Sequence, residues 1–364
     1  MKRALPIAAP LAAAFALASC GSVSYYWQGI QGEMDILQRA EPIPAVVEVT
    51  SDATLKRKLE RSLAIRAFAS RELGLPDNGS YKNYADLGRR FVLWNVVATP
   101  ELSLEPRQWC FPIAGCVNYR GYFDEAAANA EAAQFTAAGD DVHIGGVPAF
   151  STLGYFNDPI LSTFIRYPDP EVARLIFHEL AHQVAYAKDD SVFNESFAVA
   201  VEQEGVQRWL AAQHDPTLVA QVESSERYRE GFRALADRTR ARLASLYASK
   251  ESDEVKRAGK AVAFAQMRAD YIALKTSWGG SGVYDGWFAQ GPTNASLAGL
   301  ALYTRKVPQF RALLAEEDGD LPRFYARVKA LSRMPKTDRD RILAAAGAAQ
   351  AAKVSGAVQG PNSN

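Results

Sequence analysis

The residues from Tyr167 to Gln183, YPDPEVARLIFHELAHQ, decide the local fold of the chain. Asp169 is placed to cap a helix whose first position is Pro170, and negative charge follows in the first turn. Apolar residues fill most of the positions after that turn. The stretch therefore predicts a largely apolar helix over residues 170–187.

Two histidines of this predicted helix are placed to act together. His178 and His182 are four positions apart, so they lie on the same helix face and can direct imidazole nitrogens at one ion. Glu179 lies about 100° around the helix axis, where it can reach a metal-bound water without binding the metal itself. The chain contains only four histidines, and two of them fall in this pattern. The spacing predicts a zinc site in which Glu179 is the general base.

A catalytic zinc needs a third protein ligand, and the next predicted helix supplies candidates. That helix covers residues 192–212, with Ser191 as its expected cap, and it can fold back antiparallel to the first helix. Glu195 lies in its first turn, and Glu202 lies on the same face two turns further along. A carboxylate near the connecting loop would meet the His182 end of the first helix, so the geometry favours Glu195 as the ligand. Glu202 is the alternative, or an outer partner of the site.

The two segments together resemble a class of metallopeptidases. HELAHQ at His178–Gln183, followed by NESFA at Asn194–Ala198, is similar to the gluzincins, in particular the aminopeptidase N type, in which a HELAH helix precedes an NExxA helix. Nearly all of the chain after its first twenty residues more closely resembles the bacterial aminopeptidases of lipoprotein type. That resemblance includes the cysteine loop Trp109–Phe123 and the segment Gly145–Gly154.

The resemblance implies a single Zn²⁺ ion held by His178, His182 and Glu195, with Glu179 as the base and a peptide as the substrate. The spacer between the second histidine and the third ligand is shorter than in aminopeptidase N, but a helix hairpin needs only a few linking residues. The pattern Gly-x-Met-Glu-Asn, which holds the substrate amine in aminopeptidase N, is absent, because Gly145–Ala149 has no carboxylate. Release of N-terminal residues is therefore implied by the resemblance alone.

Three interpretations of the function remain open. The chain is an aminopeptidase, a zinc endopeptidase acting on envelope proteins, or a non-catalytic metal-binding envelope lipoprotein. The last is disfavoured, because a structural zinc normally has four protein ligands and no fourth stands nearby. A di-iron carboxylate bundle needs the Glu-x-x-His motif twice, and neither His143 nor His214 has a glutamate three positions before it.

Accessory parts of the site are less well determined by the sequence. Tyr284 and Tyr303 are candidates for stabilising an oxyanion, although the chain has fifteen tyrosines. The predicted strand around residues 145–150 could pair with an extended peptide backbone, or it could be an ordinary edge strand.

The N-terminus, MKRALPIAAPLAAAFALASC, has the pattern of a secretory signal: two basic residues, a short apolar run and small residues before Cys20. It also resembles the bacterial lipobox, which implies cleavage after residue 19 and acylation of Cys20. Several acyl chains together would give a stable membrane anchor. Gly21 and Ser22 follow with no aspartate. By resemblance to Gram-negative sorting, this suggests the cell envelope, at the outer membrane facing the periplasm.

The other two cysteines are Cys110 and Cys116, six positions apart around Pro112 and Gly115. In an exported chain the compartment is oxidising, so a disulfide closing a tight loop is the favoured interpretation. A second zinc site is the alternative, but no histidine stands near enough to complete its four ligands.

The composition is that of an ordinary globular protein, with a formal net charge of +0 over 364 residues, so we expect no nucleic-acid partner. The oligomeric state stays open. The pattern predicts an α+β fold, in which a small, mostly antiparallel sheet packs on a predominantly helical, zincin-like catalytic region. The expected order is a signal peptide (1–19), an anchor and lead-in helix (20–50), a peptidase domain (51–342, with its sheet at about 90–165 and its helices at about 169–342) and a flexible tail (343–364).

Overall fold

The computed structural model describes residues 8–111 and 115–358, with side chains described in 24–111 and 115–353. The first seven residues of the predicted signal and the side chain of Cys20 lie outside this set. The fold is α+β and mostly helical, as predicted. In the described residues, no helix combines the length and the apolar character needed to cross a membrane.

The main sheet is antiparallel, with strand order β6-β3-β7. It consists of β3 (Leu93–Pro100), β6 (Arg120–Tyr122) and β7 (Asp140–Val147). Strand β7 pairs with β3 along its whole length, from Leu93 opposite Val147 to Pro100 opposite Asp140. It is an edge strand of this sheet, and it ends at Val147, within the predicted strand segment 145–150.

Two smaller sheets complete the β-structure of the described residues. The first has the order β1-β2-β8 and contains β1 (Glu41–Pro42), β2 (Asn83–Ala85) and β8 (Ile160–Leu161), with β2 and β8 parallel. Its first two strands lie before residue 90, so the expected sheet boundary is too narrow. The second is a hairpin of β4 (Trp109–Phe111) and β5 (Gly115–Val117).

The predicted disulfide closes this hairpin. Cys110 and Cys116 lie opposite each other in the register of β4 and β5, and their sulfur atoms are bonded. The prediction of a disulfide is confirmed.

The helices fall close to the predicted ranges and extend beyond the last one. In chain order they are α1 (Ala8–Arg39), α2 (Ile43–Val49), α3 (Ala53–Arg71), α4 (Glu125–Ala137), α5 (Asp169–Val184), α6 (Ser191–Gln213), α7 (Pro216–Ala248), α8 (Asp253–Ser277), α9 (Asp285–Ala289), α10 (Asn294–Thr304), α11 (Val307–Glu316), α12 (Leu321–Ser332) and α13 (Lys336–Val358).

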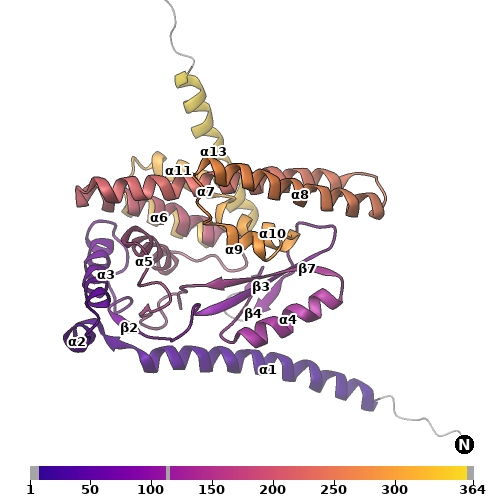
Figure 1. Cartoon of the computed structure of the whole chain (residues 1–364), viewed down its shortest axis with the longest axis horizontal. Coiled ribbons are helices and arrows are strands. Elements are labelled where there is room, and N and C mark those ends of the chain that lie inside the picture. The colour runs from indigo at the N-terminus through magenta and orange to yellow at the C-terminus, as the bar shows by residue number, and fades with distance from the viewer. Residues whose placement is uncertain (1–7, 112–114, 359–364) are drawn as a thin grey trace, which may run out of the picture.

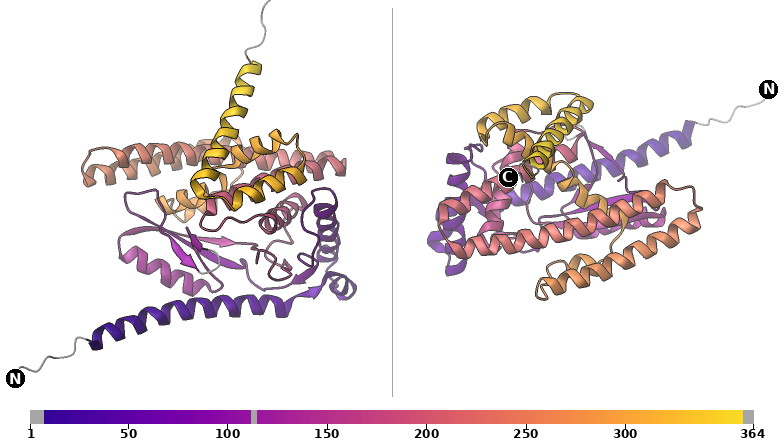
Figure 2. Two further views of the ribbon diagram at one scale, coloured as in Figure 1. Left: turned by 180° about the vertical axis from the view of Figure 1, so that it is seen from behind. Right: turned by 90° about the horizontal axis from the view of Figure 1, so that it is seen from above.

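These elements form layers (Figure 1). Helix α1 runs along one side, the long antiparallel pair α7 and α8 runs along the opposite side, and the main sheet with α5 and α6 lies between them. The same order is visible from behind, and α7 and α8 cross the molecule side by side when seen from above (Figure 2). The helix that follows the predicted signal is thus packed on the domain.

Helix α5 begins at Asp169, but the Asp169 side chain does not cap it. The N-cap is Pro168, and no side chain makes a cap hydrogen bond. The Asp169 carboxylate instead accepts a hydrogen bond of 2.6 Å from Lys58 and lies 3.3 Å from the guanidinium of Arg61, both on α3. The predicted cap is wrong, because two cations from a distant helix take the carboxylate.

Helix α6 is capped by Asp190 rather than by the predicted Ser191. The Asp190 carboxylate accepts a hydrogen bond from the backbone N–H of Phe193 at 3.2 Å. The same carboxylate lies 3.1 Å from both Lys336 and Arg339 of α13. The start of α6 is therefore tied to the C-terminal helix.

The C-terminal region differs from the predicted flexible tail at 343–364. Helix α13 continues to Val358, and Leu343 and Ala346 are buried in or against the core. Alanine has the highest helix propensity, so an alanine-rich segment that also packs its apolar positions extends the helix. Residues 359–364 lie outside the described set.

The close packing of α5 against α6 depends on Gly205. A Cβ atom at this position would lie 2.7 Å from the ring of Phe177 on α5 and 2.8 Å from Leu73, which is too close for a side chain. Phe177 is fully buried in the largest core cluster. Glycine thus allows the two helices to approach each other.

Candidate functional site

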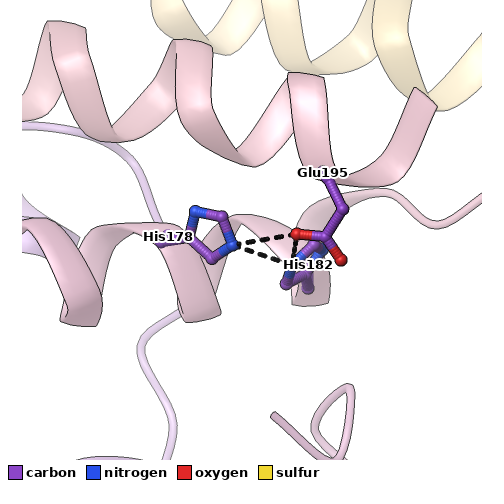
Figure 3. Close-up of side chains that lie close together, drawn as sticks. All are labelled: His178, His182 and Glu195. Atoms are coloured by element: carbon purple, nitrogen blue, oxygen red, sulfur yellow. Dashed lines mark hydrogen bonds and ion pairs between the residues drawn. The ribbon is translucent and has the colours of Figure 1, made fainter. Parts of the chain in front are cut away.

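Three predicted ligand side chains converge between α5 and α6 (Figure 3). The Nε2 atoms of His178 and His182 are 3.3 Å apart. One carboxylate oxygen of Glu195 lies 3.3 Å from the first nitrogen and 3.7 Å from the second. All three side chains are buried, each with about 8% of its surface exposed. The structure therefore brings together the three residues that the sequence singled out.

The separations of these donor atoms fit a small divalent cation. Bonds of about 2.0–2.1 Å in a tetrahedral arrangement place neighbouring ligand atoms about 3.3–3.4 Å apart. The three observed separations are 3.3, 3.3 and 3.7 Å. Among the described residues, this is the one group of three or more His, Cys, Asp or Glu side chains whose ligand atoms all lie within 4.8 Å of one another.

Asn194 holds the turn that positions Glu195. Its amide oxygen accepts a hydrogen bond of 2.7 Å from the backbone N–H of Ala187, and its Nδ2 donates one of 2.9 Å to the carbonyl of the same residue. Both bonds are buried. The loop between α5 and α6 is therefore short and closed by a side chain, which sets the register of Glu195 against the histidines.

Glu202 orients His178 from the other side. Its Oε2 lies 2.8 Å from His178 Nδ1, while its Oε1 accepts a hydrogen bond of 3.1 Å from Arg174. Arg174 also reaches Glu226 on α7 at 2.5 Å. The alternative ligand of the sequence analysis is thus an outer partner, and it directs the Nε2 atom of His178 toward Glu195. Such carboxylate contacts fix the tautomer and the orientation of a metal-binding imidazole.

Charges within the cluster compensate for burial. Burial opposes the charged form of His178, but its contacts with Glu195 and Glu202 outweigh this and raise its pKa. Burial lowers the pKa of His182 to about 4. Burial opposes the ionised form of Glu195, yet His182 and His178 hold its pKa below the ordinary value. The directions for His182 and Glu195 favour a neutral imidazole beside an ionised carboxylate, which is the state in which such groups bind a metal, whereas His178 would release its proton when a metal binds.

Glu179 lies beside the cluster without joining it. Its side chain is buried, and burial, followed by the negative charges of Glu195 and Asp158, raises its pKa to about 8. A carboxylate in such surroundings is a strong proton acceptor for its type.

Two tyrosines stand around the site: Tyr303, which the sequence suggested, and Tyr119, which it did not. The ring of Tyr303 lies 6.4 Å from that of His178, and the charge of Glu195 is the main cause that raises its pKa. Burial and then Glu195 raise the pKa of Tyr119. By contrast, Tyr284 stacks on Phe232 in a different cluster, beside α7 and α8. Of the two tyrosines suggested by the sequence, only Tyr303 lies beside the cluster of His178, His182 and Glu195; Tyr119 carried no local sequence signal.

A cavity of about 1040 Å³ opens beside the cluster. His178, Glu179 and Glu195 line it, together with Glu33 of α1 and Arg233 of α7. The buried donor atoms are therefore reachable by a molecule several residues long.

Comparison with known proteins identifies the family of the chain. No curated protein and no solved structure matches the chain. The profile of the family described as "Putative aminopeptidase" matches residues 24–343, which cover most of the chain and include the helix before residue 50, both site helices and the cysteine hairpin. The chain belongs to the putative aminopeptidase family.

Proposed function

We propose that the protein is a zinc-dependent peptidase of the cell envelope that releases N-terminal residues from peptides. The observation that carries the proposal is the set of three donor atoms separated by 3.3, 3.3 and 3.7 Å, with a buried carboxylate, Glu179, beside them. His178, His182 and Glu195 would hold one Zn²⁺ ion and leave one vertex of a tetrahedron to the cavity. Membership of the aminopeptidase family supports the peptide as substrate.

The chain's own residues supply the remaining chemistry. When bound, zinc supplies Lewis-acid polarisation of the scissile carbonyl and acidifies water at the site. Glu179 takes the proton of the attacking water and passes it to the leaving amine. Tyr303, whose ring lies 6.4 Å from that of His178, would donate a hydrogen bond to the oxyanion. Glu202 keeps His178 oriented throughout.

Substitution of Glu179 by glutamine tests the role of the base. We expect the full-length Glu179→Gln variant in detergent to retain bound zinc, because the ligands are untouched, and to lose peptide hydrolysis by at least about 100-fold. Zinc is measured by mass spectrometry, and hydrolysis is measured on peptides with free and acetylated N-termini. The exposed Glu223 serves as the matched control, since Glu223→Gln should leave both values unchanged. Retained hydrolysis in Glu179→Gln would remove the proposed base.

The peptide panel also separates the two kinds of peptidase. An aminopeptidase cleaves free N-termini and spares acetylated ones, whereas an endopeptidase acting on envelope proteins cleaves both. Absence of hydrolysis, with zinc bound, would favour a non-catalytic metal protein.

We also propose a lipid anchor at Cys20. The support is the lipobox-like sequence before it, together with the helix that leads from it onto the domain. Cys20→Ala should abolish incorporation of labelled fatty acid. The variant should also move the protein from the membrane fraction to the soluble fraction, if its signal is still cleaved.

A further inference from the structure

We propose that Glu33, on helix α1, binds the free α-amino group of the substrate and thereby selects peptides with an unblocked N-terminus. The inference rests on the proposed peptidase function and names the residue that would give it exopeptidase specificity.

The Glu33 carboxylate has no partner among the described residues. It lines the same cavity as the metal-ligand cluster. Its Oε2 atom is buried and makes no hydrogen bond, and the side chain forms no ion pair with any described residue. The residue as a whole is half-buried, but a buried carboxylate oxygen without a partner has a stability cost unless a ligand supplies the missing cation.

The neighbourhood of Glu33 adds negative rather than positive charge. Burial, followed by the charge of Asp158, raises the pKa of Glu33 to about 7. Asp158 is itself buried, but its oxygens accept hydrogen bonds from Thr152 N–H at 3.1 Å, from Thr152 Oγ1 at 2.7 Å and from Ser151 Oγ at 3.3 Å. Asp158 is therefore satisfied by the protein, whereas Glu33 is not. An ammonium group would supply the missing contact and offset the repulsion between Glu33 and Asp158.

Other carboxylates of the cavity are already engaged. Glu195 faces the two histidines, Glu202 contacts His178 and Arg174, and Glu226 pairs with Arg174 and Arg229. Asp237 has the nearby charge of Arg240. Glu179 is the proposed base. Glu33 is thus the carboxylate on the cavity wall that is left for a cationic group.

The position of Glu33 fits the direction of a bound peptide. A peptide added antiparallel to the edge strand β7 has its N-terminus near Val147, because neighbouring antiparallel strands run in opposite directions. The segment after Val147 leads to Phe150, whose ring lies 5.6 Å from that of Phe123. Phe123 in turn presses on α1 at Gly32, where a Cβ atom would lie 2.1 Å from its ring. Glu33, the next residue, lines the cavity together with Val147 and the segment that follows it, which is the end of β7 where the amine would be.

Helix α1 is held firmly at this place. The backbone N–H of Phe123 donates a hydrogen bond of 3.0 Å to the side chain of Gln28, and the guanidinium of Arg120 lies 4.0 Å above the ring of Tyr25. A carboxylate that binds an ammonium group at a fixed position must be carried by a rigid element.

The test compares free and acetylated forms of the same peptide. In the full chain with zinc, we expect Glu33→Gln to lower kcat/KM for free-amine peptides by about 10- to 100-fold, the usual effect of losing one charge-assisted hydrogen bond. Zinc content should stay unchanged, and Glu33→Asp should recover part of the loss. The exposed Glu48 of α2 is the matched control, since Glu48→Gln should have no effect.

A binding measurement separates this inference from the proposed reaction. In the Glu179→Gln background, calorimetry with a free dipeptide amide and its acetylated twin reports amine recognition without turnover. We expect a preference for the free amine that Glu33→Gln removes. A preference that persists in the Glu33→Gln background overturns the assignment, as does a loss of activity that is equal for free and acetylated peptides. Failure of the wild-type protein to hydrolyse any peptide overturns the proposed function, while the binding experiment still decides the role of Glu33.

Discussion

Glu195 and Glu33 line one cavity, yet the chain treats the two carboxylates in opposite ways. Glu195 lies against two imidazoles, and these hold its pKa below the ordinary value despite burial. Glu33 has no such partner, and burial with Asp158 raises its pKa to about 7. A buried carboxylate that has positively charged or hydrogen-bonding partners in the protein is already stabilised. A buried carboxylate without such partners indicates a position where a ligand would supply the positive charge.

The largest effect on zinc binding and hydrolysis is expected when a partner of Glu195 is removed. We expect His178→Ala to lose tight zinc binding and all hydrolysis, because two donors rarely hold the ion. In wild-type protein, zinc at about 1,000 times its dissociation constant should stabilise the fold by about 4 kcal/mol, and the variant should lose this gain. Thermal melts with and without zinc measure it. An equal zinc-induced rise in Tm in both proteins would contradict the proposed ligand set.

A smaller effect on zinc binding is expected when both histidines remain but His178 loses its contact with Glu202. Glu202→Gln removes the charge that faces His178 Nδ1 at 2.8 Å. We expect zinc affinity to fall by about 10- to 100-fold, as for other carboxylates that orient a metal-binding histidine. Competition with a chelating dye measures the affinity. Glu226→Gln is the control, since Glu226 contacts Arg174 but not the histidine. If both variants lose zinc affinity equally, the affinity depends on the charge network and not on the contact with His178.

The smallest effect concerns Glu33 and depends on pH. Its folded pKa of about 7 lies above the ordinary 4.5, so the folded state holds the proton more tightly than the unfolded state. The stability that this proton contributes is complete below about pH 4.5 and is lost as the pH rises through 7.

Substitution by glutamine should therefore remove a destabilising charge only at high pH. We expect Glu33→Gln to raise Tm by about 1–2 °C at pH 8.5, which corresponds to about 1 kcal/mol in a chain of this size, and to change it little at pH 5. Melts are done with a chelator present, so that zinc binding does not contribute. A variant that is less stable than wild type at pH 8.5 would show that Glu33 has a structural partner after all.

The two regions also differ in how far the sequence could predict them. His178, His182 and Glu195 lie within eighteen consecutive residues, so helix spacing and one short loop determine where they meet. Glu33 and Tyr119 reach the same cavity from segments far away in the chain, and periodicity carries no information about such contacts.

Local rules also failed where a tertiary contact was stronger. Asp169 has the sequence position of a helix cap, but Lys58 and Arg61 of α3 bind its carboxylate. Residues after 342 have the composition of a flexible tail, but burial of Leu343 and Ala346 keeps them helical. In each case the deciding partner lies on another element, which a single helix pattern cannot reveal.

The continuity of α1 sets how the cavity would sit relative to a bilayer. Ala8–Arg39 is one helix, and thirteen residues at 1.5 Å each separate Cys20 from Glu33, about 20 Å along its axis. If Cys20 carries acyl chains, this rigid helix would hold the cavity close to the lipid headgroups, whereas a flexible linker would let it move away from them. Polypeptide ends emerging close to that surface would then meet the enzyme at high local concentration.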